Sequence, residues 1–341
     1  MTVLLFIATV ILSIPHWTIQ TSGVTVRLRG VSAVSERIAW ACGAESTVLR
    51  TSDGGATWRP LTVIPDAADR VDFRDIDAID ARTAYVLSIG NGPASRIYKT
   101  TDAGATWVLQ FKNEDPKAFY DAMSFWDAEH GIVMGDSIDG QFCILTTEDG
   151  GRSWKRVAAS GLPPALPNEG AFAASGTNIA VFGRSRAWIG TGAGANARVL
   201  RTHDRGRTWA IAATPLIAGP SAGIFSITFR DARHGVIVGG DYKKENEAER
   251  NLAVTSDGGV TWRLVKGLSG FRSAVAYVPG VGRPALVAVG PAGADYSTDD
   301  GRTWRPIEDR GFDALSFVPG ALTGFASGAR GSLGRLAFES R

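Results

Sequence analysis

An eight-residue pattern, Ser/Thr-x-Asp-x-Gly-x-Ser/Thr-Trp, occurs six times in this chain and constrains its fold more than any other feature. The copies lie at residues 51–58, 100–107, 147–154, 202–209, 255–262 and 297–304. A period of roughly 40 to 55 residues is typical of propellers and solenoids, in which each repeat is one structural unit. The chain is therefore expected to be a single array of similar units.

Each repeat has the composition of four short strands. In the first repeat, the runs 31–34, 38–41 and 47–50 are apolar or alternate between apolar and polar residues, and Trp58 opens a fourth run at 58–61. The first strands of the later repeats are expected to begin near Phe73, Tyr120, Glu169, Ala222, Phe271 and Phe312. Together with the first repeat, these strand starts define seven units, one more than the six copies of the pattern.

The last unit, residues 312–338, lacks the pattern and has room for about three strands. A strand from the N-terminus, near residues 24–28, would complete this unit and hide two sheet edges. The sequence therefore predicts an all-β fold, a seven-bladed β-propeller closed by an N-terminal strand. Six separate blades followed by a frayed tail is the alternative.

The N-terminal run 1–14 is apolar and has the length of the hydrophobic region of a signal peptide, which is shorter than a membrane-spanning helix. It has no basic residues in front and no Ala-x-Ala cleavage site behind. We expect residues 1–22 to be a leader, residues 23–341 to be one propeller domain, and the protein to be periplasmic or secreted. A buried first strand is the alternative for this run.

Charge and cysteine content exclude several function classes. The formal net charge is only +2, so no general attraction to nucleic acid is expected. Cys42 and Cys143 lie in apolar runs of different repeats, which favours two buried free thiols over a disulfide. The four histidines do not cluster, so the sequence predicts no metal and no cofactor.

Every position of the repeated pattern has a role in a tight turn. Glycine at the fifth position can adopt positive φ, and the aspartate can accept hydrogen bonds from backbone N–H groups of its own turn. The tryptophan is large enough to pack between neighbouring sheets. We therefore assign a structural role to Asp53, Trp58, Asp102, Trp107, Asp149, Trp154, Asp204, Trp209, Asp257, Trp262, Asp299 and Trp304.

The pattern resembles the Asp-box, or BNR repeat, of sialidases, xyloglucan-cleaving glycosidases, sortilin-like receptors and photosystem II stability/assembly factors. Including the runs 28–34, 39–43 and 48–55, the whole repeat most resembles the photosystem II assembly-factor-like propellers and their bacterial relatives. The resemblance covers almost all of the chain after the leader. It implies an exported, non-enzymatic assembly or binding protein with seven blades, whose boxes lie on the face away from the ligand-binding face.

The opposite face would then collect the candidate binding residues. Arg29, Arg74, Asp121, Arg272 and Asp313 occupy equivalent positions at the starts of first strands, so they are expected to surround the mouth of the central channel. Such residues could bind a carboxylate or an acidic peptide, or could pair with one another. The loops between second and third strands supply Asp136, Arg184, Arg186, Asp241, Tyr242 and Lys243, and Glu169 and Phe172 are expected to start the first strand of blade 4.

These residues predict a recognition surface for a protein or peptide partner, with integral membrane proteins among the candidates, on a monomeric scaffold. Solvated loop tips are the alternative for the loop residues. The competing function is a secreted glycoside hydrolase that uses Asp136, Glu169 and Asp241 as acid and base on a carbohydrate. A sialidase would carry Arg-Ile-Pro before the first box, and this chain does not. We predict no catalytic residue.

Overall fold

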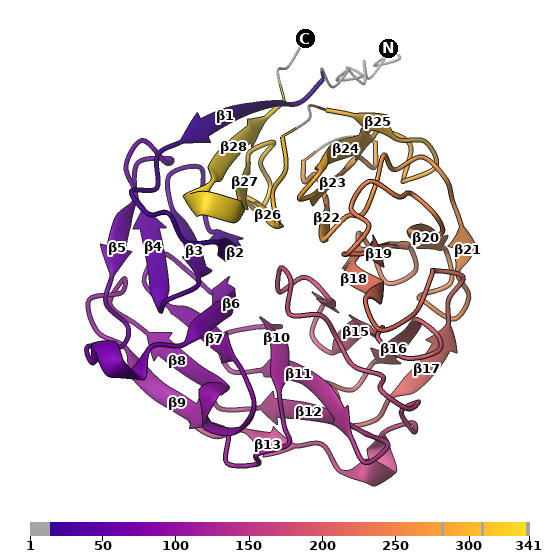
Figure 1. Cartoon of the computed structure of the whole chain (residues 1–341), viewed down its shortest axis with the longest axis horizontal. Helices are drawn as coiled ribbons and strands as arrows, with labels where there is room; N and C mark the ends of the chain where they lie inside the picture. The colour runs from indigo at the N-terminus through magenta and orange to yellow at the C-terminus, as the bar shows by residue number, and fades with distance from the viewer. Residues whose placement is uncertain (1–13, 281–282, 308–309, 339–341) are drawn as a thin grey trace, which may run out of the picture.

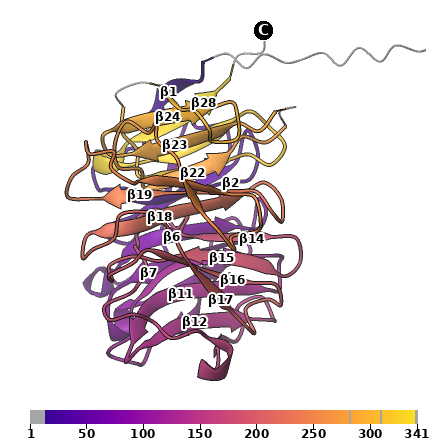
Figure 2. The same cartoon turned by 90° about the vertical axis from the view of Figure 1, so that its right-hand side faces the viewer.

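The computed structural model describes residues 14–280, 283–307 and 310–338, which form seven four-stranded antiparallel sheets arranged around a central axis (Figure 1). Seen edge-on, the strands run between the two faces of a disc (Figure 2). The predicted all-β, seven-bladed propeller is confirmed. Within the described residues, no helix is long and apolar enough to cross a membrane.

The strands follow chain order from the axis outward in blades 1 to 6. Blades 1 to 3 consist of β2 (Leu28–Ala33), β3 (Ala39–Gly43), β4 (Thr47–Thr51) and β5 (Arg59–Leu61); β6 (Asp72–Ala78), β7 (Ala84–Ile89), β8 (Arg96–Thr100) and β9 (Val108–Lys112); and β10 (Tyr120–Phe125), β11 (Gly131–Ile138), β12 (Gln141–Thr147) and β13 (Lys155–Arg156). Blades 4 to 6 consist of β14 (Ile179–Phe182), β15 (Arg186–Gly190), β16 (Arg198–Thr202) and β17 (Ala210–Ala213); β18 (Ala222–Phe229), β19 (Gly235–Asp241), β20 (Leu252–Thr255) and β21 (Arg263–Leu264); and β22 (Ala274–Tyr277), β23 (Leu286–Gly290), β24 (Gly293–Ser297) and β25 (Arg305–Pro306). Four 3-10 turns lie in connections: η1 (Ala67–Asp69), η2 (Gly92–Ala94), η3 (Ala159–Gly161) and η4 (Ala329–Gly331).

Blade 7 joins the two ends of the chain. It contains β26 (Ala314–Phe317), β27 (Gly324–Ser327), β28 (Leu333–Ala337) and, as its outer strand, β1 (His16–Gln20). β1 pairs antiparallel with β28 in the register His16 to Ala337. The N-terminal closure is therefore as predicted, but the closing strand lies earlier than residues 24–28.

The earlier position has a geometric reason. The chain must pass from the outer edge of blade 7 to the inner edge of blade 1, which is about three strand spacings or roughly 14 Å. Residues 21–27 make that crossing and lead directly into β2, so they cannot also form the outer strand. The strand at 16–20 lies inside the predicted leader 1–22, so the propeller begins before residue 23; residues 1–13 lie outside the described part of the chain.

A side-chain contact fastens the closing strand to the first box. The Gln20 amide donates to the carbonyl oxygen of Gly54 at 2.9 Å and accepts from the indole N–H of Trp58 at 3.0 Å. Trp58 also packs edge-on against Phe325 of β27, with ring centroids 6.3 Å apart. Blades 7 and 1 are thus joined by an apolar contact and by two hydrogen bonds from one side chain.

Each box aspartate is bound within its own turn. In the first box, the Thr51 hydroxyl donates to one Asp53 carboxylate oxygen at 2.8 Å, and the Thr57 hydroxyl donates to the other at 2.6 Å. The Thr57 backbone N–H adds a third bond at 2.9 Å. These hydrogen bonds, with that from the Thr57 hydroxyl the largest, lower the pKa of Asp53 to about 2. The same bonds recur in the other five boxes.

Each box also donates a backbone N–H to the loop that joins the first and second strands of its blade. The accepting carbonyls belong to Arg37, Arg82, Glu129, Ser185, Arg233 and Pro284, at 2.8 to 3.1 Å. The boxes and these loops therefore share one face of the disc. The loops between second and third strands, and the connections between blades, lie on the other face.

Blade 4 departs from the predicted strand positions. Its first strand, β14, begins at Ile179 rather than near Glu169, and residues 183–185 join its first and second strands. The prediction that Arg184 and Arg186 lie on the face opposite the boxes is therefore wrong. Their carbonyl oxygens accept hydrogen bonds from Arg205 of the fourth box and from Trp126.

The core consists of apolar clusters between adjacent blades. Trp40 and Trp188 are the largest fully buried side chains among the described residues. Cys42 and Cys143 are both buried and free, as predicted. Because every blade packs on two neighbours, the inner strands are fixed, and the residues at their ends are held at defined positions around the axis.

Candidate functional site

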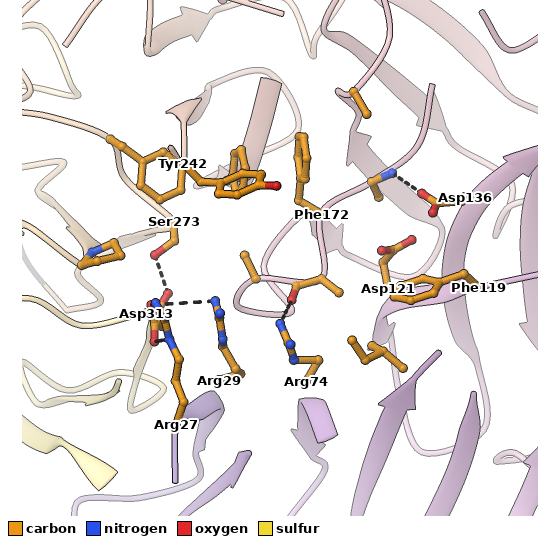
Figure 3. Close-up of a pocket in the computed structure, with 18 of the residues that line it drawn as sticks. Arg27, Arg29, Arg74, Phe119, Asp121, Asp136, Phe172, Tyr242, Ser273 and Asp313 are labelled. Atoms are coloured by element: carbon orange, nitrogen blue, oxygen red, sulfur yellow. Dashed lines mark hydrogen bonds and ion pairs between the residues drawn. The ribbon is translucent and has the colours of Figure 1, made fainter. Parts of the chain in front are cut away.

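A pocket of about 610 Å³ lies at the centre of the face opposite the boxes (Figure 3). Residues at the starts of the first strands line it, together with the connection from β13 to β14 and the loop after β19. Its walls thus come from blades on all sides of the axis. The pocket has a floor, a basic wall, an aromatic wall and an acidic end.

The floor is the segment 171–178, which turns into the central channel before β14 begins. The Ser175 hydroxyl donates to the carbonyl oxygen of Ser273 at 2.8 Å, and the Thr177 hydroxyl bonds the Ser226 hydroxyl at 2.8 Å. Arg74 donates to the carbonyl oxygen of Ala173 at 2.9 Å. These contacts join blades 2, 5 and 6 across the axis, so the pocket has a fixed floor.

A glycine allows the floor segment to approach blade 2. Gly176 has φ +74°, and a Cβ atom there would lie 2.1 Å from a carboxyl oxygen of Asp75. Asp75 is buried, and its other oxygen accepts the Met123 backbone N–H at 2.7 Å. Burial raises the pKa of Asp75 to about 8. No larger residue fits at position 176 without displacing this carboxyl group.

The basic wall contains three arginines and two carboxylates. Arg27 holds Asp313 with two hydrogen bonds of 2.7 Å, and Arg74 holds Asp72 at 2.7 and 3.0 Å. Arg29 reaches Asp313 only at 3.9 Å. Three cations against two anions leave a net charge of +1 on this wall.

Arg29 is the member of this wall with unused donors. Its side chain is 19% exposed and makes no hydrogen bond to another described residue. Burial lowers the pKa of Arg29 to about 10, and the nearby Arg74 and Arg27 cations also lower it, against the attraction of Asp313. A guanidinium in this setting favours any ligand that brings a carboxylate or carbonyl oxygen.

The aromatic wall is built around Phe225. Phe172 stacks on it with ring centroids 4.0 Å apart, Phe271 meets it edge-on at 4.6 Å, and Tyr242 lies 6.1 Å away. Tyr242 is 43% exposed, so it forms the rim of the pocket. This wall offers rigid apolar surface next to the basic wall.

The acidic end consists of Asp121 at the start of β10 and Asp136 in β11. Asp136 accepts the Ala171 backbone N–H at 3.2 Å, and burial raises its pKa to about 6. Asp121 is 2% exposed, and its Oδ2 atom has no hydrogen-bond partner among the described residues. Burial, with the Asp136 charge adding, raises the pKa of Asp121 well above its usual range.

Glu169 lines the same pocket but is fully engaged. Its carboxylate accepts from the Thr191 hydroxyl at 2.6 Å, from the Leu166 backbone N–H at 2.8 Å, and from both Nε and Nη2 of Arg198. It fixes the connection from β13 to β14 to blade 4. The Glu169 side chain therefore positions the pocket wall and has no free oxygen for a ligand.

The structure brings seven of the predicted binding-face residues into this one pocket: Arg29, Arg74, Asp121, Asp136, Glu169, Phe172 and Tyr242. Asp241 and Lys243 flank it, and the Asp241 carboxylate caps the Lys243 backbone N–H at 3.0 Å. Of the acid set of the glycosidase alternative, Asp136 and Glu169 line the pocket and Asp241 does not.

Arg272 differs from the other arginines at the channel mouth. It is fully buried, and its guanidinium binds Asp295 at 2.6 and 2.7 Å. Further bonds reach the Ser269 hydroxyl at 2.5 Å and the Phe271 carbonyl oxygen at 2.8 Å. The channel-mouth residues were expected either to bind a ligand or to pair with one another, and Arg272 pairs within the protein, with Asp295.

Sequence reasoning missed Arg27, Phe119, Phe225 and Glu245, which also line the pocket. A signal for Arg27 was present, because it lies two residues before Arg29 and alternate residues of an extended chain face the same side. No such signal marked Phe225, which reads as one more apolar residue of a buried strand.

Within residues 14–280, 283–307 and 310–338, no three His, Cys, Asp or Glu side chains gather as a metal site would require.

Comparison with known proteins gives distant relatives. No protein-family model matches the chain. The photosystem II assembly protein Ycf48 of Thermosynechococcus vestitus is 22% identical over 259 residues, covering 54% of this chain and 72% of that protein. The vacuolar protein sorting/targeting protein 10 of Colletotrichum graminicola is 31% identical over 108 residues, covering 30% of this chain and only 7% of that protein.

Solved structures match over nearly the full length. A structure described as YCF48 bound to D1 peptide has a TM-score of 0.67 at 18% identity, covering 97% of this chain and 99% of that one. YCF48 from Cyanidioschyzon merolae has a TM-score of 0.67 at 17% identity, with coverages of 94% and 98%. At these identities the structural match establishes the fold. The chain is thus a seven-bladed propeller similar to Ycf48, distantly in sequence and closely in architecture.

Proposed function

We propose that this protein binds a segment of a partner polypeptide in the central pocket, on the face opposite the boxes, and acts as a binding or assembly scaffold. The observation that carries the proposal is Arg29, whose guanidinium is held in the pocket with its donors unused by the described residues. A planar guanidinium binds a carboxylate or a main-chain carbonyl oxygen in a fixed geometry.

The aromatic wall supplies the second part of a peptide site. Phe172 and Tyr242 present apolar area beside Arg29, and large aromatic side chains contribute strongly to recognition because they are rigid. The fixed floor reduces the entropy that binding would otherwise cost. The similar propeller that was solved with a D1 peptide supports a polypeptide as the class of ligand.

The test is direct binding. We would measure fluorescence polarisation of the labelled D1 peptide, and of overlapping peptides from membrane proteins of the host, with wild type and variants. Arg29→Ala should weaken binding by about 10- to 100-fold, because a hydrogen bond to a charged group is worth about 1.5–3 kcal/mol. Tyr242→Ala should also weaken it.

Arg184→Ala is the matched control, since it removes an exposed arginine from the box face. It should leave the dissociation constant unchanged. If Arg29→Ala binds as tightly as wild type while Arg184→Ala does not, the central pocket is not the site. Turnover of a glycoside substrate, abolished by Asp136→Asn, would instead favour the hydrolase alternative.

The cellular setting is part of the proposal. The apolar run at the N-terminus supports a periplasmic or secreted location. The location is tested by fusing to the C-terminus of the full chain a reporter that is active only outside the cytoplasm, and by fractionating the cells that express it. A reporter that stays inactive would contradict it.

A further inference from the structure

The acidic end of the central pocket has a feature that the basic and aromatic walls do not explain. Asp121 is 2% exposed, lines the pocket, and has a carboxyl oxygen without a hydrogen-bond partner among the described residues. A buried carboxyl group without a hydrogen-bond partner destabilises the folded state. No hydrogen bond from the described residues to the Oδ2 atom offsets the burial of this carboxyl group.

We propose that Asp121, with Asp136 beside it, forms a subsite that binds a cationic nitrogen of the peptide ligand, either a Lys or Arg side chain or a free α-amino group. The inference rests on the proposed function and adds the charge of one ligand residue to it. On this proposal the ligand cation compensates the charge of the buried Asp121 carboxyl group.

The geometry permits this role. Figure 3 shows the Asp121 and Asp136 carboxyl groups at one end of the pocket, and the Arg29 and Arg74 side chains reaching in from another side. Asp121 lines the pocket, so a cation in the pocket lies near the charge of its carboxyl group even though the Oδ2 atom itself is enclosed. Asp136 is held by the Ala171 backbone N–H through one oxygen and stays available through the other.

The neighbouring charges favour a cation at this end. Glu169 is already neutralised by Arg198, so it does not compete for the ligand. In the free protein, burial and Asp136 favour the protonated form of Asp121, and an arriving cation would favour the ionised form. The pocket would therefore select a peptide that carries an anion or carbonyl at Arg29 and a cation at Asp121.

A positional-scanning library of short peptides, acetylated at the N-terminus and amidated at the C-terminus, tests the inference. Wild type should enrich Lys or Arg at one position, and replacing that residue by norleucine in the best binder should weaken binding about 10- to 100-fold. Asp121→Asn keeps the shape and removes the charge, so it should abolish the preference, and Asp136→Asn should reduce it. A second library with free N-termini identifies the α-amine as the source if only those peptides show the effect.

Asp241→Asn is the matched control, because Asp241 flanks the pocket without lining it. It should keep the wild-type preference, and all variants should keep the far-UV circular dichroism spectrum of the folded wild type. The inference is overturned if peptides bind and depend on Arg29 while showing no preference for a cation, or if Asp121→Asn keeps that preference. Failure of every peptide to bind would overturn the proposed function together with the inference.

Discussion

Replacing Arg272, which does not itself line the pocket, should destabilise the propeller. This arginine and Asp295 are both fully buried, and the pair is joined at 2.6 and 2.7 Å. Ser269 completes the network by donating its hydroxyl to Asp295 at 3.0 Å and its backbone N–H at 3.2 Å. Arg272→Met keeps most of the side-chain volume and removes all of its donors, so the Asp295 charge would keep only Ser269 as partner.

The size of the effect follows from burial. Removing one member of a fully buried ion pair costs about 3–5 kcal/mol, because the remaining charge stays out of water without its counterion. Replacing both members by apolar residues of similar volume is often neutral or stabilising. Arg272→Met should therefore lower the free energy of unfolding by about 3–5 kcal/mol, and the double variant Arg272→Met/Asp295→Leu should recover most of that loss.

Urea unfolding followed by tryptophan fluorescence and by far-UV circular dichroism measures both numbers, provided that the two transitions coincide. Arg184→Met, on the exposed box face, is the control and should change stability by less than about 0.5 kcal/mol. The reasoning is refuted if Arg272→Met is as stable as wild type, or if the double variant is no more stable than Arg272→Met.

Three further changes test other parts of the fold. Gln20→Ala should lower the free energy of unfolding by about 1–3 kcal/mol, measured by urea denaturation, because it leaves the indole N–H of Trp58 without its acceptor; an unchanged midpoint would show that the outer-strand contact is dispensable. Burial holds the pKa of Asp75 at about 8, so the folded protein keeps a proton that the unfolded chain releases, and stability should fall as pH rises from about 4 to about 8, by up to about 1.4 kcal/mol per pH unit. Asp75→Asn should reduce that slope in the same titration, and the slope that remains comes from other buried carboxyl groups with raised pKa values, such as Asp121 and Asp136. A slope equal to that of wild type would contradict the assignment. Gly176→Ala should lower the free energy of unfolding more than Gly183→Ala, because both glycines have positive φ but only position 176 would place a Cβ atom against Asp75. Equal losses would mean that the floor segment can move away from Asp75.

The box turns were predictable because their bonds are local. All donors to Asp53 lie within four residues of it, so spacing alone specifies the turn. Six such turns, with one shorter unit at the end, were enough to predict seven blades and closure by the N-terminus. The closing strand was misplaced because pairing of β1 with β28 joins the two ends of the chain, and no local pattern encodes that register.

Blade 4 shows where periodicity fails. Residues 169–178 have the apolar and small composition of a first strand, but their hydrogen bonds go to Ser226 and Ser273 on other blades. Those partners lie 49 and 98 residues away from Thr177 and Ser175. The displaced strand moved Arg184 and Arg186 to the box face, although the repeat spacing had placed them opposite.

The sequence by itself determined the box turns, because the hydrogen bonds of each turn lie within a few consecutive residues. The repetition of these turns, with one shorter unit after the last, indicated the number of blades. Only the tertiary structure decided what the residues at the channel mouth do. Arg29 and Arg272 hold equivalent positions, but Arg272 is neutralised by Asp295 in the third strand of its own blade, whereas Arg29 shares Asp313 with Arg27. Arg27 and Asp313 are 286 residues apart in the chain, so whether a guanidinium is buried in a pair or left facing a pocket is settled by packing around the axis.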